Sequence, residues 1–195
     1  MKVAIISDIH ENFHNLILTL IELEKLKIER ILLLGDLMNN GIAKILAASL
    51  IPVFGIWGNN DGDKIAITKT SLRPGSNLEM GFGTYDFLEI DGRKLFLTHY
   101  PLLAKSMAKS GDFDAIFYGH DHKKNIDTFG KCLILNPGEI SGHKTGEATF
   151  AVYDTSTNEA EIKIINNSMS LKTKTVDNYL EKNKLTLGEG KTRIY

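Results

Sequence analysis

Residues 3–10 of this chain read Val-Ala-Ile-Ile-Ser-Asp-Ile-His, and this stretch decides the fold. Val3–Ile6 is a short β-branched run of the kind that forms a buried strand. Asp8 and His10 follow at once, so a carboxylate and an imidazole stand just past the expected strand end. Residues two apart in an extended segment point the same way, so both could reach one cation. The alternative is ordinary helix capping, which is common for an aspartate at a strand-to-helix junction.

The segments that follow alternate between helical and strand patterns. Residues 12–27 show apolar side chains at helical spacing, and residues 31–34 form a second buried-strand run. Residues 42–50 are rich in alanine and leucine and predict another helix, and residues 53–57 predict a third strand. This β-α-β-α-β order predicts parallel strands joined by right-handed crossovers.

The second half of the chain has a more antiparallel character. Asp91-Gly92 is a strong hairpin signal, and proline opens a predicted helix over residues 101–110. We expect these strands to form a second, more antiparallel sheet that packs on the first, giving a four-layer α/β/β/α sandwich of two mixed sheets flanked by helices. The strands expected in this half are residues 85–90, 94–98, 115–118, 126–129, 132–135, 148–153 and 159–165.

Composition indicates one domain over residues 1–165, followed by a polar, lysine-rich extension over residues 166–195. In that extension Val176, Tyr179 and Leu180 would form one side of a short helix. The single cysteine, Cys132, lies in an apolar run, which excludes a disulfide framework within the chain and indicates a buried thiol.

Net charge and hydropathy narrow the classes of function. The formal net charge is -1, so nothing electrostatic favours stable binding to nucleic acid or to an anionic membrane. No targeting segment is recognised, and no run approaches the roughly 20 apolar residues of a membrane span. We therefore expect a cytoplasmic protein without membrane association, and a homo-oligomer remains compatible with the sequence.

Separated pieces of the chain end on side chains of metal-binding types, and most of them follow an apolar run. Strand ends in an open α/β sheet meet at one rim, where such sheets place their sites. Two aspartates, one asparagine and four histidines gathered there would hold two divalent cations, and mixed oxygen and nitrogen ligands suit Mn, Fe, Zn or Co better than calcium. The pieces end at Asp8 and His10, Asp36, Asn59 and Asp61, His99, His120 and His122, and Glu139.

Each piece also has an ordinary interpretation when it is taken alone. Gly35-Asp36 is a common turn, and residues 58–62 are rich in turn formers. A single histidine at a strand end, such as His99, is more often a hydrogen-bonded structural residue. Gly119-His120-Asp121-His122 is the most specific piece, because two histidines two residues apart after a glycine rarely arise from packing needs.

In this order the pieces resemble the calcineurin-like metallophosphoesterase superfamily, whose pattern is Asp-x-His, Gly-Asp, Gly-Asn-x-Asp, His and Gly-His-x-His. The resemblance runs from Met1 to about Ile165 and is greatest to the compact archaeal and bacterial phosphodiesterase branch, which is also related to a retromer scaffold subunit. It implies two divalent metals, with Mn favoured and Ni, Fe, Zn, Co or Mg as alternatives, and a hydroxide between them that attacks phosphorus. It also implies a first metal held by Asp8, His10, Asp36 and His122, a second held by Asp36, Asn59, His99 and His120, and catalytic roles for Asn59, Asp61 and His99.

The chain departs from the family pattern at a few positions. Asn60 stands where the family's phosphatases often carry histidine, and an amide cannot deliver a proton as an imidazolium does. This favours diesters or activated esters. Tyr100 follows His99 where close relatives often have glycine, and its ring would narrow the pocket, while Asp121 would add negative charge near an anionic substrate.

The resemblance implies a metal-dependent phosphodiesterase that acts on a small phosphoester. Two alternatives remain from the sequence. The same site would serve a phosphomonoesterase or a nucleotide pyrophosphohydrolase, because the metal centre does not choose among these esters. The same fold would also serve a non-catalytic scaffold, although such a scaffold is expected to lose metal ligands.

Overall fold

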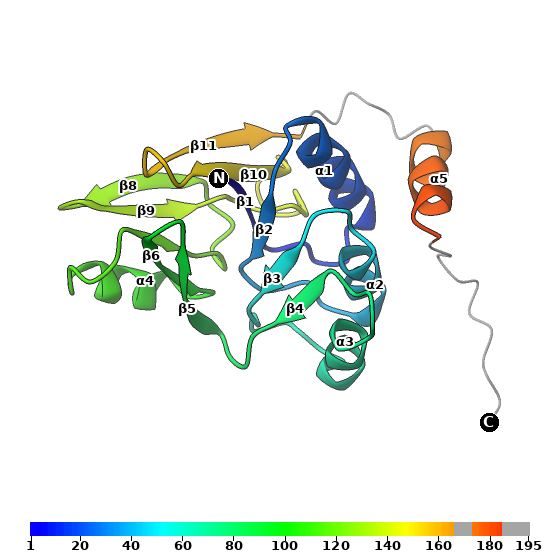
Figure 1. Cartoon of the computed structure of the whole chain (residues 1–195), viewed down its shortest axis with the longest axis horizontal. Coiled ribbons are helices and arrows are strands. Elements are labelled where there is room, and N and C mark those ends of the chain that lie inside the picture. The colour runs from blue at the N-terminus through cyan, green and yellow to red at the C-terminus, as the bar shows by residue number, and fades with distance from the viewer. Residues whose placement is uncertain (166–172, 185–195) are drawn as a thin grey trace.

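The computed structural model of the chain describes residues 1–165 and 173–184 (Figure 1). Two β-sheets lie face to face in the middle, with helices on the outer face of each sheet. Each sheet combines parallel and antiparallel neighbours. The expected four-layer α/β/β/α sandwich is confirmed.

The first sheet is six-stranded and is built around β1. β1 to β4 run parallel to one another, whereas β10 pairs antiparallel with β1 and β11 pairs antiparallel with β10. Its strands, in spatial order, are β11 (Glu159–Ile164), β10 (Thr149–Asp154), β1 (Lys2–Ile6), β2 (Arg30–Leu33), β3 (Val53–Gly55) and β4 (Leu78–Met80).

The second sheet is five-stranded, with three parallel strands at its centre and one antiparallel strand at each edge. The hairpin predicted around Asp91-Gly92 is present as β5 and β6, with Ile90 opposite Arg93. The strands, in spatial order, are β5 (Tyr85–Ile90), β6 (Arg93–Thr98), β7 (Ala115–Phe117), β9 (Cys132–Asn136) and β8 (Asn125–Phe129).

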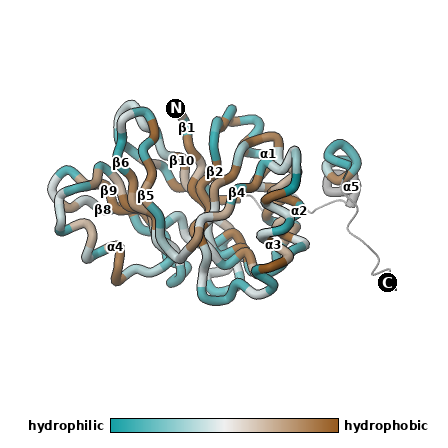
Figure 2. The backbone as a smooth tube through the Cα atoms, turned by 60° about the horizontal axis from the view of Figure 1, so that its bottom comes forward, coloured by the Kyte–Doolittle hydropathy of each residue, from teal (hydrophilic) through white to brown (hydrophobic). Residues whose placement is uncertain are grey.

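Successive side chains of β1 point to opposite faces of the sheet, and both faces are buried, so the strand is apolar on both. Ala4 and Ile6 pack among the helices of the first sheet, whereas Val3 and Ile5 pack between the two sheets. A third apolar layer joins the second sheet to α4. Figure 2 shows the apolar strands running through the interior. The helices are α1 (Phe13–Lys25), α2 (Asn40–Ala47), α3 (Lys64–Ser71), α4 (Pro101–Ala108) and α5 (Thr173–Lys182).

Two parts of the topology differ from the prediction. β10 and β11 were expected in the second sheet, but they extend the first sheet from the open edge of β1. α3 and β4 were not predicted, because α3 has little amphipathic pattern and β4 is a strand of 3 residues with one buried side chain, Leu78. β4 forms the free edge of the first sheet, beside the linker to β5.

The short helix expected near the end of the chain is present as α5, although the side chain of Val176 lies outside the described residues. Tyr179 and Leu180 are buried in the apolar layer on the helical side of the first sheet. Lys182 Nζ lies 3.1 Å from Glu24 Oε2 of α1. The remaining parts of the predicted extension, residues 166–172 and 185–195, lie outside the described residues, and the domain boundary at residue 165 stays a prediction.

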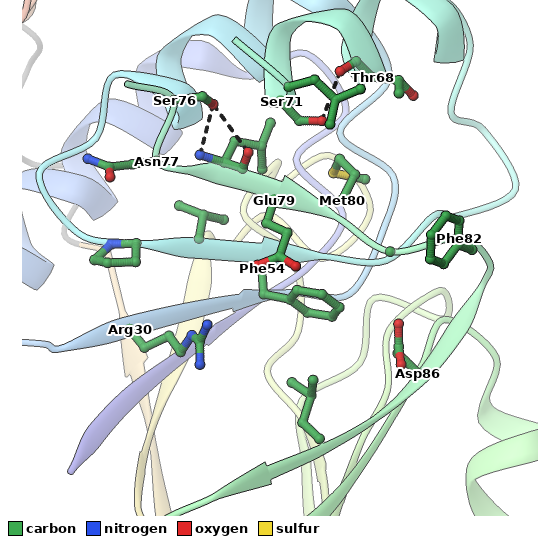
Figure 3. A pocket seen from close by; sticks show the side chains of 16 residues that line it. Arg30, Phe54, Thr68, Ser71, Ser76, Asn77, Glu79, Met80, Phe82 and Asp86 are labelled. Atoms are coloured by element: carbon green, nitrogen blue, oxygen red, sulfur yellow. Dashed lines mark hydrogen bonds between the residues drawn. The ribbon is translucent and has the colours of Figure 1, made fainter. Parts of the chain in front are cut away.

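A hollow of about 740 Å³ opens along β4 and the start of β5 (Figure 3). Phe54, Met80 and Phe82 give it apolar walls, and Arg30 and Asp86 add charge. None of the predicted metal ligands lines it. Among the described residues no helix has both the length and the apolar character needed to cross a bilayer.

Cys132 is buried on β9 against α4, as expected. Burial raises the pKa of its thiol from 9.0 to about 11, so the folded protein keeps it neutral. We expect a thiol-specific dye at neutral pH to label Cys132 no faster than the protein unfolds, with Cys132→Ala as the background. Rapid labelling of the folded protein would contradict this prediction.

The raised pKa of Cys132 also makes the stability of the fold depend on pH. Because the folded pKa exceeds the unfolded value, the contribution of this group to stability is full below pH 9 and is lost between pH 9 and about 11.

Candidate metal centre

The predicted ligand side chains are carried by loops that follow the parallel strands of both sheets. Asp8 and His10 follow β1, Asp36 follows β2, and Asn59 follows β3. From the other sheet, His99 follows β6, and His120 and His122 follow β7. Because parallel strands end on the same rim, these loops meet above the apolar layer between the sheets.

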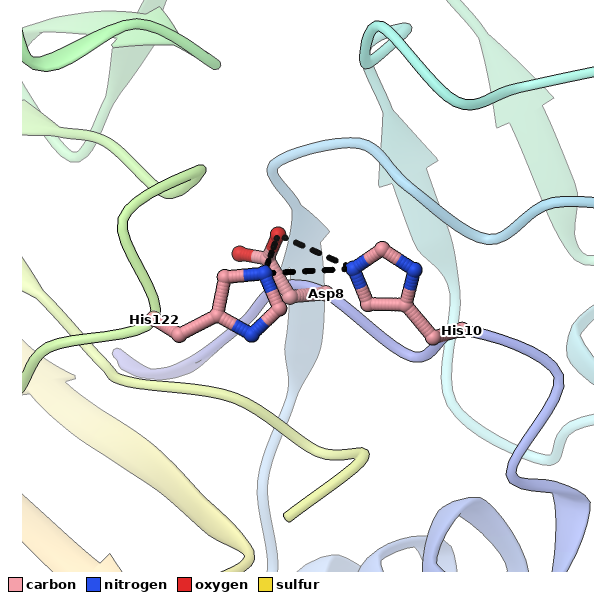
Figure 4. A group of neighbouring side chains, drawn as sticks. All are labelled: Asp8, His10 and His122. Carbon is pink, nitrogen blue, oxygen red and sulfur yellow. Dashed lines mark hydrogen bonds and ion pairs between the residues drawn. The ribbon is translucent and has the colours of Figure 1, made fainter. Parts of the chain in front are cut away.

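Asp8, His10 and His122 form one group of side chains (Figure 4). Asp8 Oδ1 lies 3.3 Å from His122 Nε2 and 3.6 Å from His10 Nε2. The two Nε2 atoms are 3.2 Å apart, and the rings stack with centroids 4.9 Å apart. All three side chains therefore direct a ligand-type atom at the same point.

A second group, Asp8, Asp36 and His99, lies beside the first and shares Asp8 with it. Asp36 Oδ2 is 3.6 Å from His99 Nε2 and 3.5 Å from His10 Nε2 of the first group. Asn59 Oδ1 lies 2.9 Å from His99 Nε2 and 2.8 Å from His120 Nδ1. The structure thus brings together all seven side chains that the sequence predicted as ligands.

The chemistry of these atoms fits divalent cations. Asp8 Oδ1 is buried and has no hydrogen-bond partner among the described residues. Such an atom is costly in an apolar interior unless a cation or a donor satisfies it. The Nδ1 atoms of His99 and His122 face the Leu34 carbonyl and Glu139, at 2.7 Å each. Each Nδ1 can therefore donate its proton outward, which leaves the Nε2 lone pair for a metal.

Electrostatics at the site are dominated by the buried carboxylates. Burial acts to raise the pKa of Asp8, but interactions with His10 and Ser7 outweigh it and lower that pKa. Asp8 in turn raises the pKa of His10 against the effect of burial. The pKa of His120 is lowered, first by burial and then by the positive field of His99. The negative charge of these buried carboxylates favours cation binding.

The backbone is left-handed rather than extended at five of the seven predicted ligands. The φ angle is 54° at Asp8, 43° at His10, 56° at Asp36, 74° at His120 and 65° at His122. The extended geometry that we expected for Asp8-x-His10 is therefore wrong, although the two side chains do converge. Residues other than glycine seldom adopt this region, and it is a recognised form of strain at functional sites.

Glycines let the loops approach one another closely. A Cβ atom at Gly58 would lie 2.5 Å from the backbone nitrogen of Asp36. A Cβ atom at Gly119 would lie 2.9 Å from Asp8 Oδ2 and would also collide with Ser7 Oγ. The absence of a side chain at these positions brings Asp36 and Asp8 next to ligands from other loops.

Asp61 contacts backbone N–H groups, one of which belongs to the predicted ligand Asp36. Its Oδ2 accepts hydrogen bonds from the backbone N–H groups of Asp36, at 3.1 Å, and Gly58, at 2.7 Å. Its Oδ1 accepts from the backbone N–H of Met38 at 2.8 Å. Asp61 thus ties the loop after β3 to the loop after β2, which makes it a positioning residue in this geometry.

The positions that depart from the family pattern have definite contacts. Asn60 donates its backbone N–H and its side-chain amide to the two oxygens of Asp36, at 2.8 Å each. The Tyr100 ring lies edge-on to both His99 and His120, with centroids 5.3 Å away in each case. Asp121 accepts from the Asn136 amide at 2.7 Å. This bond ties the loop of Asp121 to the end of β9, and the expected effect of its charge on an anionic substrate stays a prediction.

The contacts of Glu139 were not predicted. The sequence placed this residue among the metal-type ends of the six pieces, but gave it no role. It is fully buried after β9, and its Oε2 lies 2.7 Å from His122 Nδ1. Burial acts to raise its pKa, but hydrogen bonds from Ser141, His122 and Thr145 lower it to about 2. A carboxylate at a strand end was the only signal, since its partner lies 17 positions away in the chain.

Comparison with known proteins agrees with this geometry. The model of the calcineurin-like phosphoesterase superfamily domain matches residues 1–158. The chain belongs to this superfamily. Phosphodiesterase MJ0936 of Methanocaldococcus jannaschii is 29% identical over 161 residues, which cover 82% of this chain and 96% of that protein.

Solved structures place the chain in the same branch of the superfamily. One that is described as a novel archaeal phosphodiesterase has a TM-score of 0.75 and 25% identity, and the match covers 84% of this chain and 99% of that one. YfcE, a phosphoesterase from E. coli, has a TM-score of 0.61 at 20% identity, with coverage of 85% and 100%. The second likeness supports the fold alone.

Proposed function

We propose that this protein is a metal-dependent phosphodiesterase with a two-metal centre. The observation that carries the proposal is the convergence of seven side chains with oxygen and nitrogen ligand atoms, in which Asp36 Oδ2 lies within 3.6 Å of both His10 Nε2 and His99 Nε2. The buried, unpartnered Oδ1 of Asp8 supports it, because a cation supplies the missing interaction. The name of the Methanocaldococcus relative supports a diester as the substrate.

The geometry supports a division of the ligands between two cations. Asp8, His10, Asp36 and His122 would hold the first cation, and Asp36, Asn59, His99 and His120 would hold the second. Bound divalent cations of this kind lower the pKa of a water molecule between them and take up charge on the phosphoryl oxygens. The mixed donor set fits Mn, with Ni, Fe, Zn, Co and Mg as the other candidates.

The remaining residues of the site would orient these ligands and shape the pocket. Asn60 holds both oxygens of Asp36 and thereby fixes the carboxylate that the two cations would share. Its amide cannot protonate a leaving group, so esters whose leaving group departs without a proton should react best. Tyr100 would bound the pocket beside His99 and His120 and select for a small phosphoester.

Hydrolysis of two nitrophenyl esters tests the proposal. With Mn²⁺ we expect bis-p-nitrophenyl phosphate to be hydrolysed with a higher kcat/KM than p-nitrophenyl phosphate. Chelation should abolish both activities and added Mn²⁺ should restore them, because the ligands alone supply no activated water. Turnover of neither ester with any of the six candidate cations would contradict the hydrolase proposal. A clear preference for the monoester would overturn the choice of diesters and favour a phosphomonoesterase.

A further inference from the structure

Glu139 is buried beneath the first group of ligands, and both of its carboxylate oxygens are surrounded by donors. Oε2 accepts from His122 Nδ1 at 2.7 Å, from the Ser141 hydroxyl and from the backbone N–H of His143 at 3.2 Å. Oε1 accepts from the backbone N–H groups of Lys144, at 2.9 Å, and Thr145, at 2.7 Å, and from the Thr145 hydroxyl at 2.8 Å. One oxygen thus faces His122 and the other anchors the following loop.

An ionised carboxylate can only accept hydrogen bonds, so its partner nitrogen on His122 must carry the proton. The other nitrogen, Nε2, then presents its lone pair toward Asp8 Oδ1, 3.3 Å away. Carboxylate–histidine pairs of this kind fix the tautomer and orientation of a metal ligand and raise its basicity. His99 has a different arrangement, because its Nδ1 meets the neutral carbonyl of Leu34.

We propose that Glu139 is a positioning residue that holds His122 in its metal-binding tautomer and makes the Asp8–His10–His122 group the tighter of the two cation sites. This inference rests on the proposed two-metal function. It follows from the difference between the acceptors: a negative carboxylate supports the histidine of the first group, and a neutral carbonyl supports that of the second. The first group therefore has a histidine held by a charged acceptor, and one more nearby negative charge.

Glu139→Gln is the most informative variant, because one amide cannot accept the hydrogen bonds that both carboxylate oxygens accept. If its oxygen faces the two backbone N–H groups of Lys144 and Thr145, its NH₂ points at His122 and forces Nδ1 to accept. The proton of His122 then moves to Nε2, which can no longer bind a cation. If the amide is reversed, its NH₂ meets those two N–H groups instead and the loop loses its anchor.

Titration with Mn²⁺ alone, followed by calorimetry, measures the two sites without reference to turnover. In Glu139→Gln we expect the tighter cation to bind about 10–100-fold more weakly and the weaker one to be unchanged. Glu147→Gln is the matched control, since Glu147 is exposed and pairs only with Lys124 at the surface. Thr145→Val removes a loop donor from Oε1 but leaves the contact with His122, so it should keep both affinities. Equal weakening of both sites in Glu139→Gln, or no change, would overturn the proposal.

The tautomer of His122 gives a second readout, which is measured in the wild-type protein and requires no bound metal. In cation-free wild-type protein with ¹⁵N-labelled histidine, we expect the proton of His122 on Nδ1, with the signal assigned by its loss in His122→Gln. A proton on Nε2 in the wild type would refute the proposal. Failure to hydrolyse any ester would leave this result intact, so the two proposals fail separately.

Discussion

Asp36→Asn should remove almost all phosphodiesterase activity and lower the bound metal. The Asp36 carboxylate is buried, and its Oδ2 lies 3.5 Å from His10 Nε2 and 3.6 Å from His99 Nε2. Asparagine removes the charge that both cations would share, and its NH₂ would face a donor of Asn60. Loss of a residue that only hydrogen-bonds to a metal ligand already lowers metal affinity or activity by about 10–100-fold. Loss of the shared ligand itself should therefore lower kcat/KM by more than about 100-fold. Elemental analysis and hydrolysis of bis-p-nitrophenyl phosphate with Mn²⁺ measure both effects.

His14→Ala is the control for Asp36→Asn. His14 is an exposed histidine of α1, stacked on Phe13 with ring centroids 4.1 Å apart. It contacts no member of either ligand group, so its removal should leave metal content and kcat/KM within about twofold of the wild type. Equal losses in the two variants would show that Asp36 is not a shared ligand.

Gly58→Ala should destroy the centre through a single methyl group. The added Cβ would lie 2.5 Å from the backbone nitrogen of Asp36, and it would also collide with the carboxylate of Asp36. Backbone atoms cannot rotate aside as a flexible side chain does, so one of the two loops must move and Asp61 must release Gly58 or Asp36. Overpacking of this kind costs typically 1–3 kcal/mol of stability. We expect a fall of that size in the free energy of unfolding in urea, together with loss of bound Mn²⁺.

Gly62→Ala is the matched control in the same loop. A Cβ at Gly62 would lie 3.6 Å from the Met38 carbonyl oxygen, which is an ordinary van der Waals contact. Its free energy of unfolding should stay within about 0.5 kcal/mol of the wild type, and it should keep its metal. A Gly58→Ala variant that binds Mn²⁺ as tightly as Gly62→Ala does would refute the close approach of the two loops.

Local patterns were sufficient to predict most strands and helices, because each pattern reflects which face of an element is buried. Pairing between distant strands was harder. The mainly apolar pattern of β10, Thr149–Asp154, does not distinguish between the two sheets, since each sheet has edges at which a strand could be added. Its antiparallel pairing with β1 places Lys2 opposite Asp154, 152 positions away in the chain, and no local pattern specifies such a pairing.

The candidate site was likewise predicted only in part. The ligands could be predicted because several side chains of metal-binding kinds follow strand ends in order. The contacts that hold these ligands in place could not be predicted. Glu139 reaches His122 only through the fold, and Asp61 contacts backbone N–H groups that carry no side-chain signal in the sequence. The left-handed backbone at Asp8 and His10 was also missed, because strand-like alternation was extended too far.

The left-handed backbone at the ligand positions has a consequence for directed evolution. Glycine adopts positive φ at little cost, so replacing His10 or His120 with glycine would relieve local strain while deleting a donor atom. A screen that rewarded heat resistance alone should therefore enrich substitutions at this rim and yield sturdier but inert variants. Screening for turnover alongside melting temperature would be needed to keep the imidazoles in place.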